Sequence, residues 1–190
     1  MSCKSETIKT ELPIPYPLHQ SEQGRYFIGQ TPQLNANSST ALIALVNPRC
    51  SYVNLYINAI TVTNLLQDNF SAEFYVHSNQ TLNTTSYLIS CTNLSIVPTP
   101  HNKGIIQYQS GYDLQIYNGV PIFTRIIPQT STLVIDGGQI IIPPGQSLLV
   151  LLNNISNVSS SLNNKSFIVA FGCGKNKYVP TISYSTNLFI

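Results

Sequence analysis

The chain has 190 residues, of which 43% are hydrophobic and only 8% charged, with a formal net charge of +2. This length fits one domain, and the small charge, without any cluster of Lys or Arg, excludes the electrostatic footprint of a nucleic-acid-binding protein. No apolar run reaches the roughly 18 residues of a transmembrane helix, and the polar stretch Met1–Thr7 lacks the apolar region of a secretory signal. We therefore expect no nucleic-acid partner, no membrane insertion and no classical signal peptide.

The first patterned stretch has proline at every second position, at Pro13, Pro15 and Pro17. In an extended chain, the residues that share one bonding edge and one face are Leu12, Ile14, Tyr16 and Leu18. The prolines fall on the other edge, where each lacks an N–H, so such a strand can pair on one side only. The alternative is a polyproline II linker, which needs no pairing partner. We interpret residues 1–23 as an extended N-terminal arm and residues 24–190 as a single β-sandwich domain.

Nearly every later segment with a pattern predicts a β-strand, because Ile, Val, Thr and Tyr recur in short runs and helix patterns are scarce. In chain order the expected strands are Arg25–Ile28, Thr40–Val46, Tyr52–Thr63, Ser71–His77, Ser86–Ile89, Ile105–Tyr108, Leu114–Tyr117, Phe123–Ile127, Thr132–Ile135, Gln139–Ile142, Ser147–Leu152, Phe167–Phe171 and Thr181–Ile190. Turn residues separate them. This pattern predicts an all-β fold, a jelly-roll-like β-sandwich in preference to an immunoglobulin-like topology.

Three segments carry more detailed expectations. In the run Tyr52–Thr63, strict alternation puts Val53, Leu55, Ile57, Ala59 and Thr61 on one face. Ala72, Phe74 and Val76 alternate in the same way with more polar neighbours. The tripeptide Asp136-Gly137-Gly138 predicts a tight hairpin turn between two apolar strands, and the polar, low-complexity stretch Asn153–Lys165 predicts an exposed loop.

No constellation of acids, bases and nucleophiles predicts an active site. Seven carboxylates and three histidines are spread along the chain, whereas catalysis needs such groups to converge. His77 follows Glu73 by four residues, which we interpret as a solvated pair. Gly172 and Gly174, which flank Cys173, indicate a bend in a strand, since no phosphate-binding motif surrounds them. We expect no enzyme activity, no cofactor and no metal site.

The four cysteines, Cys3, Cys50, Cys91 and Cys173, are far apart and include no C-x-x-C pair, which argues against a zinc or thioredoxin-like site. Two interpretations stay open. The thiols are buried or idle, or they form late disulfides between subunits, for which Cys3 in the arm is the natural candidate. All four are candidate intersubunit cysteines.

Several short motifs carry a family resemblance: Pro15-Tyr16-Pro17-Leu18, Gly24, Tyr26-Phe27, Gly29-Gln30-Thr31 and Pro143-Pro144-Gly145. With these motifs the chain resembles an uncharacterised family of small all-β proteins from spore-forming Firmicutes. It is more loosely similar to endospore appendage subunits, which are jelly rolls whose Cys-bearing N-terminal arm docks into neighbouring subunits and cross-links them. The shared features are an arm with Cys3, a β-rich body, low charge and no signal peptide.

This similarity implies a structural subunit that self-assembles into an extracellular or spore-surface filament, as a homo-oligomer. Its arm would add a strand to a neighbour's sheet, and disulfides would form after release from the cell. A polar, mostly uncharged surface gives little repulsion between copies, which agrees with association. The alternatives are a carbohydrate-binding β-sandwich, with a surface glycan as partner, and a phage or coat structural protein.

Overall fold

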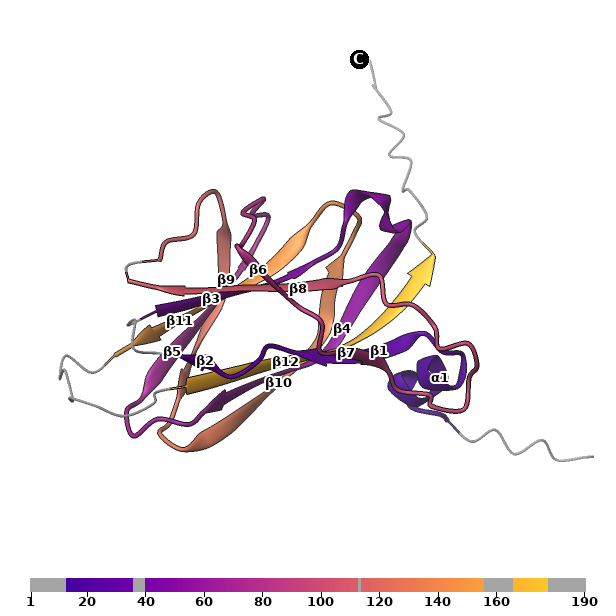
Figure 1. The fold of residues 1–190 in the computed structure, drawn as a ribbon, viewed down its shortest axis with the longest axis horizontal. Helices are drawn as coiled ribbons and strands as arrows, with labels where there is room; N and C mark the ends of the chain where they lie inside the picture. Colours follow the sequence, from indigo (N-terminus) through magenta and orange to yellow (C-terminus); the bar gives the residue numbers. More distant parts are fainter. Residues whose placement is uncertain (1–12, 36–39, 113, 156–165, 178–190) are drawn as a thin grey trace, which may run out of the picture.

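The computed structural model describes residues 13–35, 40–112, 114–155 and 166–177, which form two antiparallel sheets packed face to face and one short α-helix at one end (Figure 1). Sheet A has the order β10 (Ser131–Ile142), β4 (Val53–Asn64), β12 (Ser166–Lys177), β1 (Tyr26–Gln30) and β7 (Ile89–Cys91), with β2 (Leu34–Asn35) paired to β12. Sheet B has the order β6 (Thr84–Ser86), β8 (Ile105–Gly111), β3 (Thr40–Val46), β11 (Ser147–Asn154), β5 (Phe70–Val76) and β9 (Val120–Ile127). The other elements are α1 (Tyr16–Glu22) and the 3₁₀ helix η1 (Arg49–Ser51).

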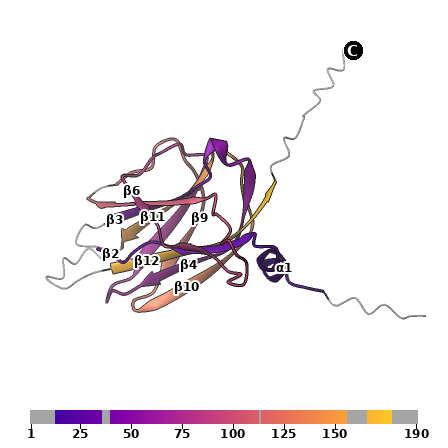
Figure 2. The same cartoon turned by 45° about the vertical axis from the view of Figure 1, so that its right-hand side comes forward.

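The order of the strands is that of a jelly roll. The sequence of strands β10-β4-β12-β1 in sheet A faces β3-β11-β5-β9 in sheet B, and the chain changes sheet at each step except between β5 and β9, which are neighbours. This is the double Greek-key arrangement of a jelly roll, so the predicted fold class is confirmed. Strands β6, β7 and β8 are inserted between β5 and β9 and extend both sheets on one side (Figure 1, and turned by 45° in Figure 2).

Strands β3 and β11 are buried on both faces, which explains why their sequences are unbroken apolar runs. On the inner face, Ile43 and Val150 belong to the large core between the sheets. On the outer face, Leu42 and Leu149 pack with Leu82 and the partly buried Leu114 and Ile116, which come from loops. The segment Leu114–Tyr117, expected as a strand, is one of these covering loops.

A β-bulge at Asn58 corrects the expected alternation in β4. Ile57 pairs with Cys173 and Ala59 with Gly172, so Asn58 is an extra residue opposite β12. An extra residue shifts the alternation by one position, and the buried set changes from Leu55 and Ile57 to Ile60, Val62 and Asn64. The prediction is therefore right up to Ile57 and wrong for Ala59 and Thr61. In β5, the predicted burial of Ala72 and Phe74 is confirmed.

The predicted hairpin at Asp136-Gly137-Gly138 is wrong. Thr132–Ile135 and Gln139–Ile142 belong to one continuous strand, β10, which pairs with β4 on both sides of a register shift between Asp136 and Ile140. The shift lies within the strand, opposite the Asn58 bulge. The expected strand Ser86–Ile89 is divided between β6 and β7, which lie in different sheets. The expected strand Thr181–Ile190 lies outside the described residues, as does most of the Asn153–Lys165 stretch.

The predicted one-sided strand in the N-terminal arm is also wrong in its described part. Tyr16 and Leu18 lie in α1, Ile14 precedes it in non-helical chain, and Leu12 lies outside the described residues. Pro17 is tolerated because the first turn of a helix needs no N–H from it. Gly24, with a φ of +64°, ends the helix: Gly24 N–H donates to Ser21 O and Arg25 N–H to Gln20 O, the paired bonds of a Schellman motif. No helix in the described part of the chain has the length and apolar character to cross a membrane.

Helix α1 packs on the outer face of sheet A through aromatic rings placed over glycines. A Cβ at Gly174 would lie 2.8 Å from the hydroxyl of Tyr16, and one at Gly172 would lie 2.6 Å from the hydroxyl of Tyr26. Tyr16 also contacts Tyr56, with ring centroids 6.3 Å apart. The expectation that these glycines bend a strand stays a prediction, and the structure gives them a further role. They leave room for two tyrosine rings, one of which attaches α1 to the body.

This packing predicts that Gly174→Val releases α1 without unfolding the sandwich. The added methyl groups would occupy the position of the Tyr16 ring, an overpacking that costs about 1–3 kcal/mol. Hydrogen exchange of Gln20 and its neighbours should accelerate, while the circular dichroism spectrum of the β-sandwich is retained. Ala170→Val, on the same face of β12, is the control. Equal exchange in both variants would show that Tyr16 does not anchor the helix.

Candidate functional site

Exposed apolar side chains gather at the end of the molecule that carries α1. Ile14 and Leu18 are about half exposed, and in the adjacent loop Leu94 is 86% and Val97 88% exposed. Figure 1 shows this loop, between β7 and β8, passing around the helix. We call this surface, formed by Ile14, Leu18, Leu94 and Val97, the apolar tip. Water contact with these four large apolar side chains is unfavourable, and covering them in an assembly would remove that cost.

Hydrogen bonds hold the two parts of the apolar tip together. The hydroxyls of Ser21 and Thr92 lie 2.8 Å apart, and the Asn93 side chain donates to Glu22 O at 3.3 Å. Behind the helix, Ile96 and Pro100 lie within 3 Å of the position that a Cβ at Gly24 would take. The tip is therefore a packed surface of the folded domain, from which the N-terminal segment continues.

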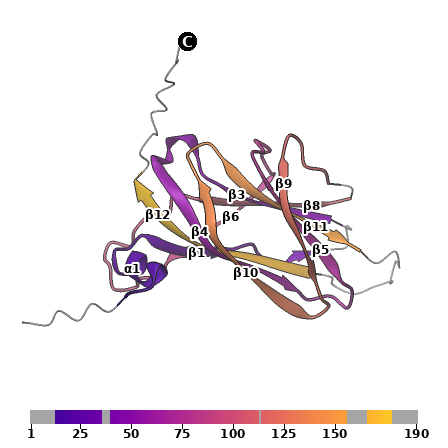
Figure 3. The ribbon, with the colours of Figure 1, turned by 180° about the vertical axis from the view of Figure 1, so that it is seen from behind.

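Among the described strands, the two sheets end at β9 and β10 on the side opposite the insertion, and within the described part of the chain neither edge has a further pairing partner (Figure 3). Strand β9 carries three features that discourage pairing: Pro121, a bulge next to it, and Arg125, whose guanidinium lies 4.9 Å from the Phe123 ring centroid. In β10 the run Ser131–Asp136 is regular and contains no proline. The edge of β10 is therefore the better template for an added strand.

The buried cysteines lie on either side of one phenylalanine. Phe27 pairs with Cys173 on one side and with Cys91 on the other, so two strand spacings, roughly 9.6 Å, separate the cysteine backbones. This separation exceeds the reach of a disulfide. Lys175 lies over the Phe27 ring, with its Nζ 4.4 Å from the centroid, and donates to His101 O at 2.6 Å. Burial lowers the pKa of Lys175.

Burial raises the pKa of Cys173 to about 12, an effect that the nearby Lys175 only partly opposes. The thiol therefore stays protonated and unreactive near neutral pH. Cys91 is buried as well, whereas Cys50 in η1 is exposed and Cys3 lies outside the described residues. In this fold neither buried thiol can reach a neighbouring subunit. Of the candidate intersubunit cysteines within the described ranges, Cys50 alone is accessible.

The structure gives Glu73 a partner other than His77. The Tyr75 hydroxyl donates to Glu73 Oε2 at 2.7 Å and the Asn153 side chain donates to Glu73 Oε1 at 3.1 Å. The hydrogen bond to Glu73 raises the pKa of Tyr75 to about 12. Across the described part of the chain, no group of three or more His, Cys, Asp or Glu side chains could hold a metal ion.

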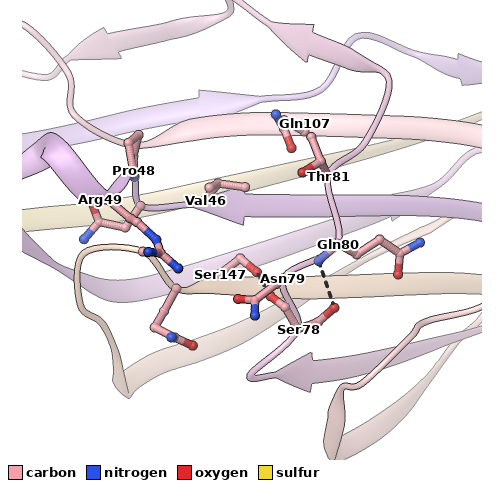
Figure 4. Close-up of a pocket in the computed structure, with 12 residues that line it drawn as sticks. Val46, Pro48, Arg49, Ser78, Asn79, Gln80, Thr81, Gln107 and Ser147 are labelled. Atoms are coloured by element: carbon pink, nitrogen blue, oxygen red, sulfur yellow. Dashed lines mark hydrogen bonds between the residues drawn. The ribbon is translucent and has the colours of Figure 1, made fainter.

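A polar pocket of ≈ 330 Å³ lies at one end of sheet B, where four segments of the chain converge (Figure 4). Its lining comprises Val46, Asn47, Pro48, Arg49, Ser78, Asn79, Gln80, Thr81, Gln107, Gly145, Gln146 and Ser147. The lining contains amides, hydroxyls and one guanidinium, with no carboxylate and no aromatic ring. Figure 4 shows Arg49, Asn79 and Ser147 turned toward one another. The sequence analysis missed this site because its residues are distant in the chain.

Hydrogen bonds fix the walls of the pocket. The Asn47 side chain donates to Val53 O and to Ile142 O, both at 2.8 Å, and Ser147 Oγ donates to Ser78 O at 2.8 Å. Asn47 is fully buried, and its Oδ1 has no hydrogen-bond partner among the described residues. A buried acceptor of this kind is costly unless water or a ligand satisfies it.

A protein-family profile described as "Family of unknown function (DUF6143)" matches residues 2–179. The chain belongs to the DUF6143 family. Membership of a family of unknown function agrees with the predicted resemblance to an uncharacterised family. Its origin in spore-forming Firmicutes and the similarity to endospore appendage subunits stay predictions. No curated protein and no solved structure matches this DUF6143 protein significantly.

The DUF6143 protein should show a graded thiol reactivity. In the native state near pH 8, iodoacetamide should modify Cys50 and leave Cys91 and Cys173 unmodified until denaturant is added, as measured by peptide mass spectrometry. Modification of Cys173 as rapid as that of Cys50 would contradict the described burial.

The raised pKa of Cys173 also makes the stability of the fold depend on pH. The contribution of the protonated thiol to stability is fully present below pH 9 and is lost as the pH rises from 9 towards 12, because the thiol of the unfolded chain ionises first.

Proposed function

We propose that this DUF6143 protein is a structural subunit that assembles with copies of itself into a filament. The N-terminal segment of one subunit adds a strand to the free β10 edge of the next, a form of β-strand addition. The observation that carries the proposal is this free, regular edge on a sandwich whose opposite side is extended by the insertion.

The occupant of the β10 edge is the segment before Pro13 of a second copy. Its sequence alternates, with Ile8, Thr10 and Leu12 separated by Lys9 and Glu11, a pattern suited to a strand with one covered face. Twelve extended residues span on the order of 40 Å, enough to cross to a neighbour. The donor is therefore shorter than the arm inferred from sequence, because α1 packs on its own domain.

The apolar surfaces agree with this arrangement. On β10, Val134 is 61% exposed and Ile141 about half exposed, and both face the outer side of sheet A. An arriving subunit brings its apolar tip, from which the donor segment continues, to this region. Contact between the two surfaces removes apolar area from water, and a chain with 8% charged residues opposes it little. Assembly at an extracellular or spore surface is part of the proposal and rests on the sequence resemblance.

Deleting residues 1–12 should leave a folded monomer that no longer assembles, because α1 and both sheets are retained. Light scattering after size exclusion and negative-stain electron microscopy measure the outcome. The control keeps the full length but scrambles residues 1–12, which preserves composition and removes the alternation, so it should also fail to assemble. Assembly by the scrambled chain would show that the segment does not bind as a strand, and loss of folding on deletion would place it in its own core.

A charge on the acceptor edge should block addition at β10 and have little effect at β9. Val134→Lys puts an ammonium on the face that the arriving subunit covers, and the cost of burying it exceeds the contribution of one strand position. Ile126→Lys is the matched control, because Ile126 on β9 is 64% exposed. The expected result is at least a tenfold loss of polymer for Val134→Lys only. Greater damage from Ile126→Lys would move the acceptor to β9.

The same preparations separate the remaining alternatives. A closed shell in electron micrographs would favour a coat protein, and dispersed monomers that bind glycans would favour a carbohydrate-binding β-sandwich.

A further inference from the structure

The polar pocket contains a cation, Arg49, that has no counter-ion among the described residues. Arg49 is exposed and makes no salt bridge or hydrogen bond with the residues that the structure describes. Its side chain crosses Gly145: a Cβ there would lie 2.9 Å from Arg49 Cγ, and Gly145 has a φ of +82°. Glycine is thus required twice, for the turn and for the close approach. The turn fixes where the guanidinium is presented.

Some of the neutral polar groups around Arg49 already form hydrogen bonds within the protein, and others are available to bind a ligand. The Gln80 side chain is engaged, since it donates to Gln115 O and accepts from Tyr117 N–H. Gln107 accepts from Leu82 N–H through Oε1, which leaves its Nε2 donors available. The side chains of Asn79, Thr81 and Gln146 form no hydrogen bonds within the described part of the chain. The pocket therefore offers one cation and several neutral donors and acceptors.

This set of groups selects a chemical class of ligand. A guanidinium binds a carboxylate through two parallel hydrogen bonds, while amides and hydroxyls match the hydroxyls of a polyol. The absence of carboxylates from the lining disfavours a bound cation, and the absence of aromatic rings removes the stacking platform that a neutral sugar would use. A volume of ≈ 330 Å³ lies at the small end of ligand pockets.

We propose that this pocket binds a carboxylate-bearing sugar, with Arg49 holding the carboxylate and Asn79, Thr81 and Gln107 holding the hydroxyls. The lining includes no residue of β10, so a filament would present one such site on each subunit. Binding is therefore independent of the proposed assembly and can be tested on the truncated as well as the full chain.

Isothermal titration calorimetry of the full chain with glucuronate, glucose and acetate tests the proposal. Glucuronate should bind with a dissociation constant of about 1 mM or lower, and glucose and acetate at least tenfold more weakly, because each lacks one half of the recognised chemistry. Arg49→Gln should weaken glucuronate binding at least tenfold. Arg125→Gln removes a cation on β9, away from the pocket, and should leave the affinity unchanged.

Asn79→Ala distinguishes recognition of the sugar hydroxyls from simple anion binding. It should weaken glucuronate binding and leave the weak binding of acetate unchanged. Three results would each overturn the proposal. They are equal affinity of the wild type and Arg49→Gln for glucuronate, equal affinity of the wild type for glucose and glucuronate, and no binding of glucuronate to the wild type. Thermal unfolding of each variant verifies that it is folded, and Arg49, which has no bonded partner, can be replaced without a loss of stability.

Discussion

The backbone pairing of β4 with β12 is the interaction on which the rest of the structure depends. These twelve-residue strands form the centre of sheet A and pair from Val53 to Asn64. The bulge at Asn58 allows the apolar side chains of both halves of β4 to face the core. The register shift in β10 lies opposite this bulge, on the other side of β4. The same pairing places Gly172 and Gly174 where Tyr26 and Tyr16 pack. The free edge and the position of α1 both follow from it.

A single insertion then makes the two sides of the jelly roll unequal. The chain between β5 and β9 adds β6 and β8 to sheet B and β7 to sheet A, and its loops cover the outer face of sheet B. It also supplies half of the apolar tip and the Ser78–Thr81 wall of the polar pocket. On the other side, no described strand covers the edges of β9 and β10. In the proposed assembly, the donor and acceptor surfaces therefore lie at different places on the subunit.

The sequence was sufficient for the features that depend on local patterns. The apolar run Thr40–Val46 was predicted to the residue, and the number and spacing of strands indicated the jelly roll. The helix could have been found, because Pro17 in the first turn and Gly24 after the last residue are its usual boundary signals, but alternating prolines also fit an extended chain. The prediction of a strand failed there because the same prolines fit both the start of a helix and an extended chain.

Features that depend on a neighbouring strand could not be predicted. The Asn58 bulge exists only relative to β12, and nothing in the sequence of β4 marks it. Asp136-Gly137-Gly138 has the composition of a hairpin, and only the pairing of both its flanks with β4 reveals a continuous strand. The pocket around Arg49 joins segments nearly 100 residues apart. The low charge predicts a surface suited to association, which stays a prediction, and it does not indicate where on the molecule the contact would form.

Hydrogen–deuterium exchange of β10, compared between dilute subunits and assembled material, tests the central claim most directly. Strand addition at this edge pairs backbone N–H groups that face water in the free subunit, so the account predicts slower exchange of the Ser131–Asp136 amides on assembly, with β9 unchanged. Two results would contradict it: unchanged exchange in β10 together with slower exchange in β9, and unchanged exchange in both strands.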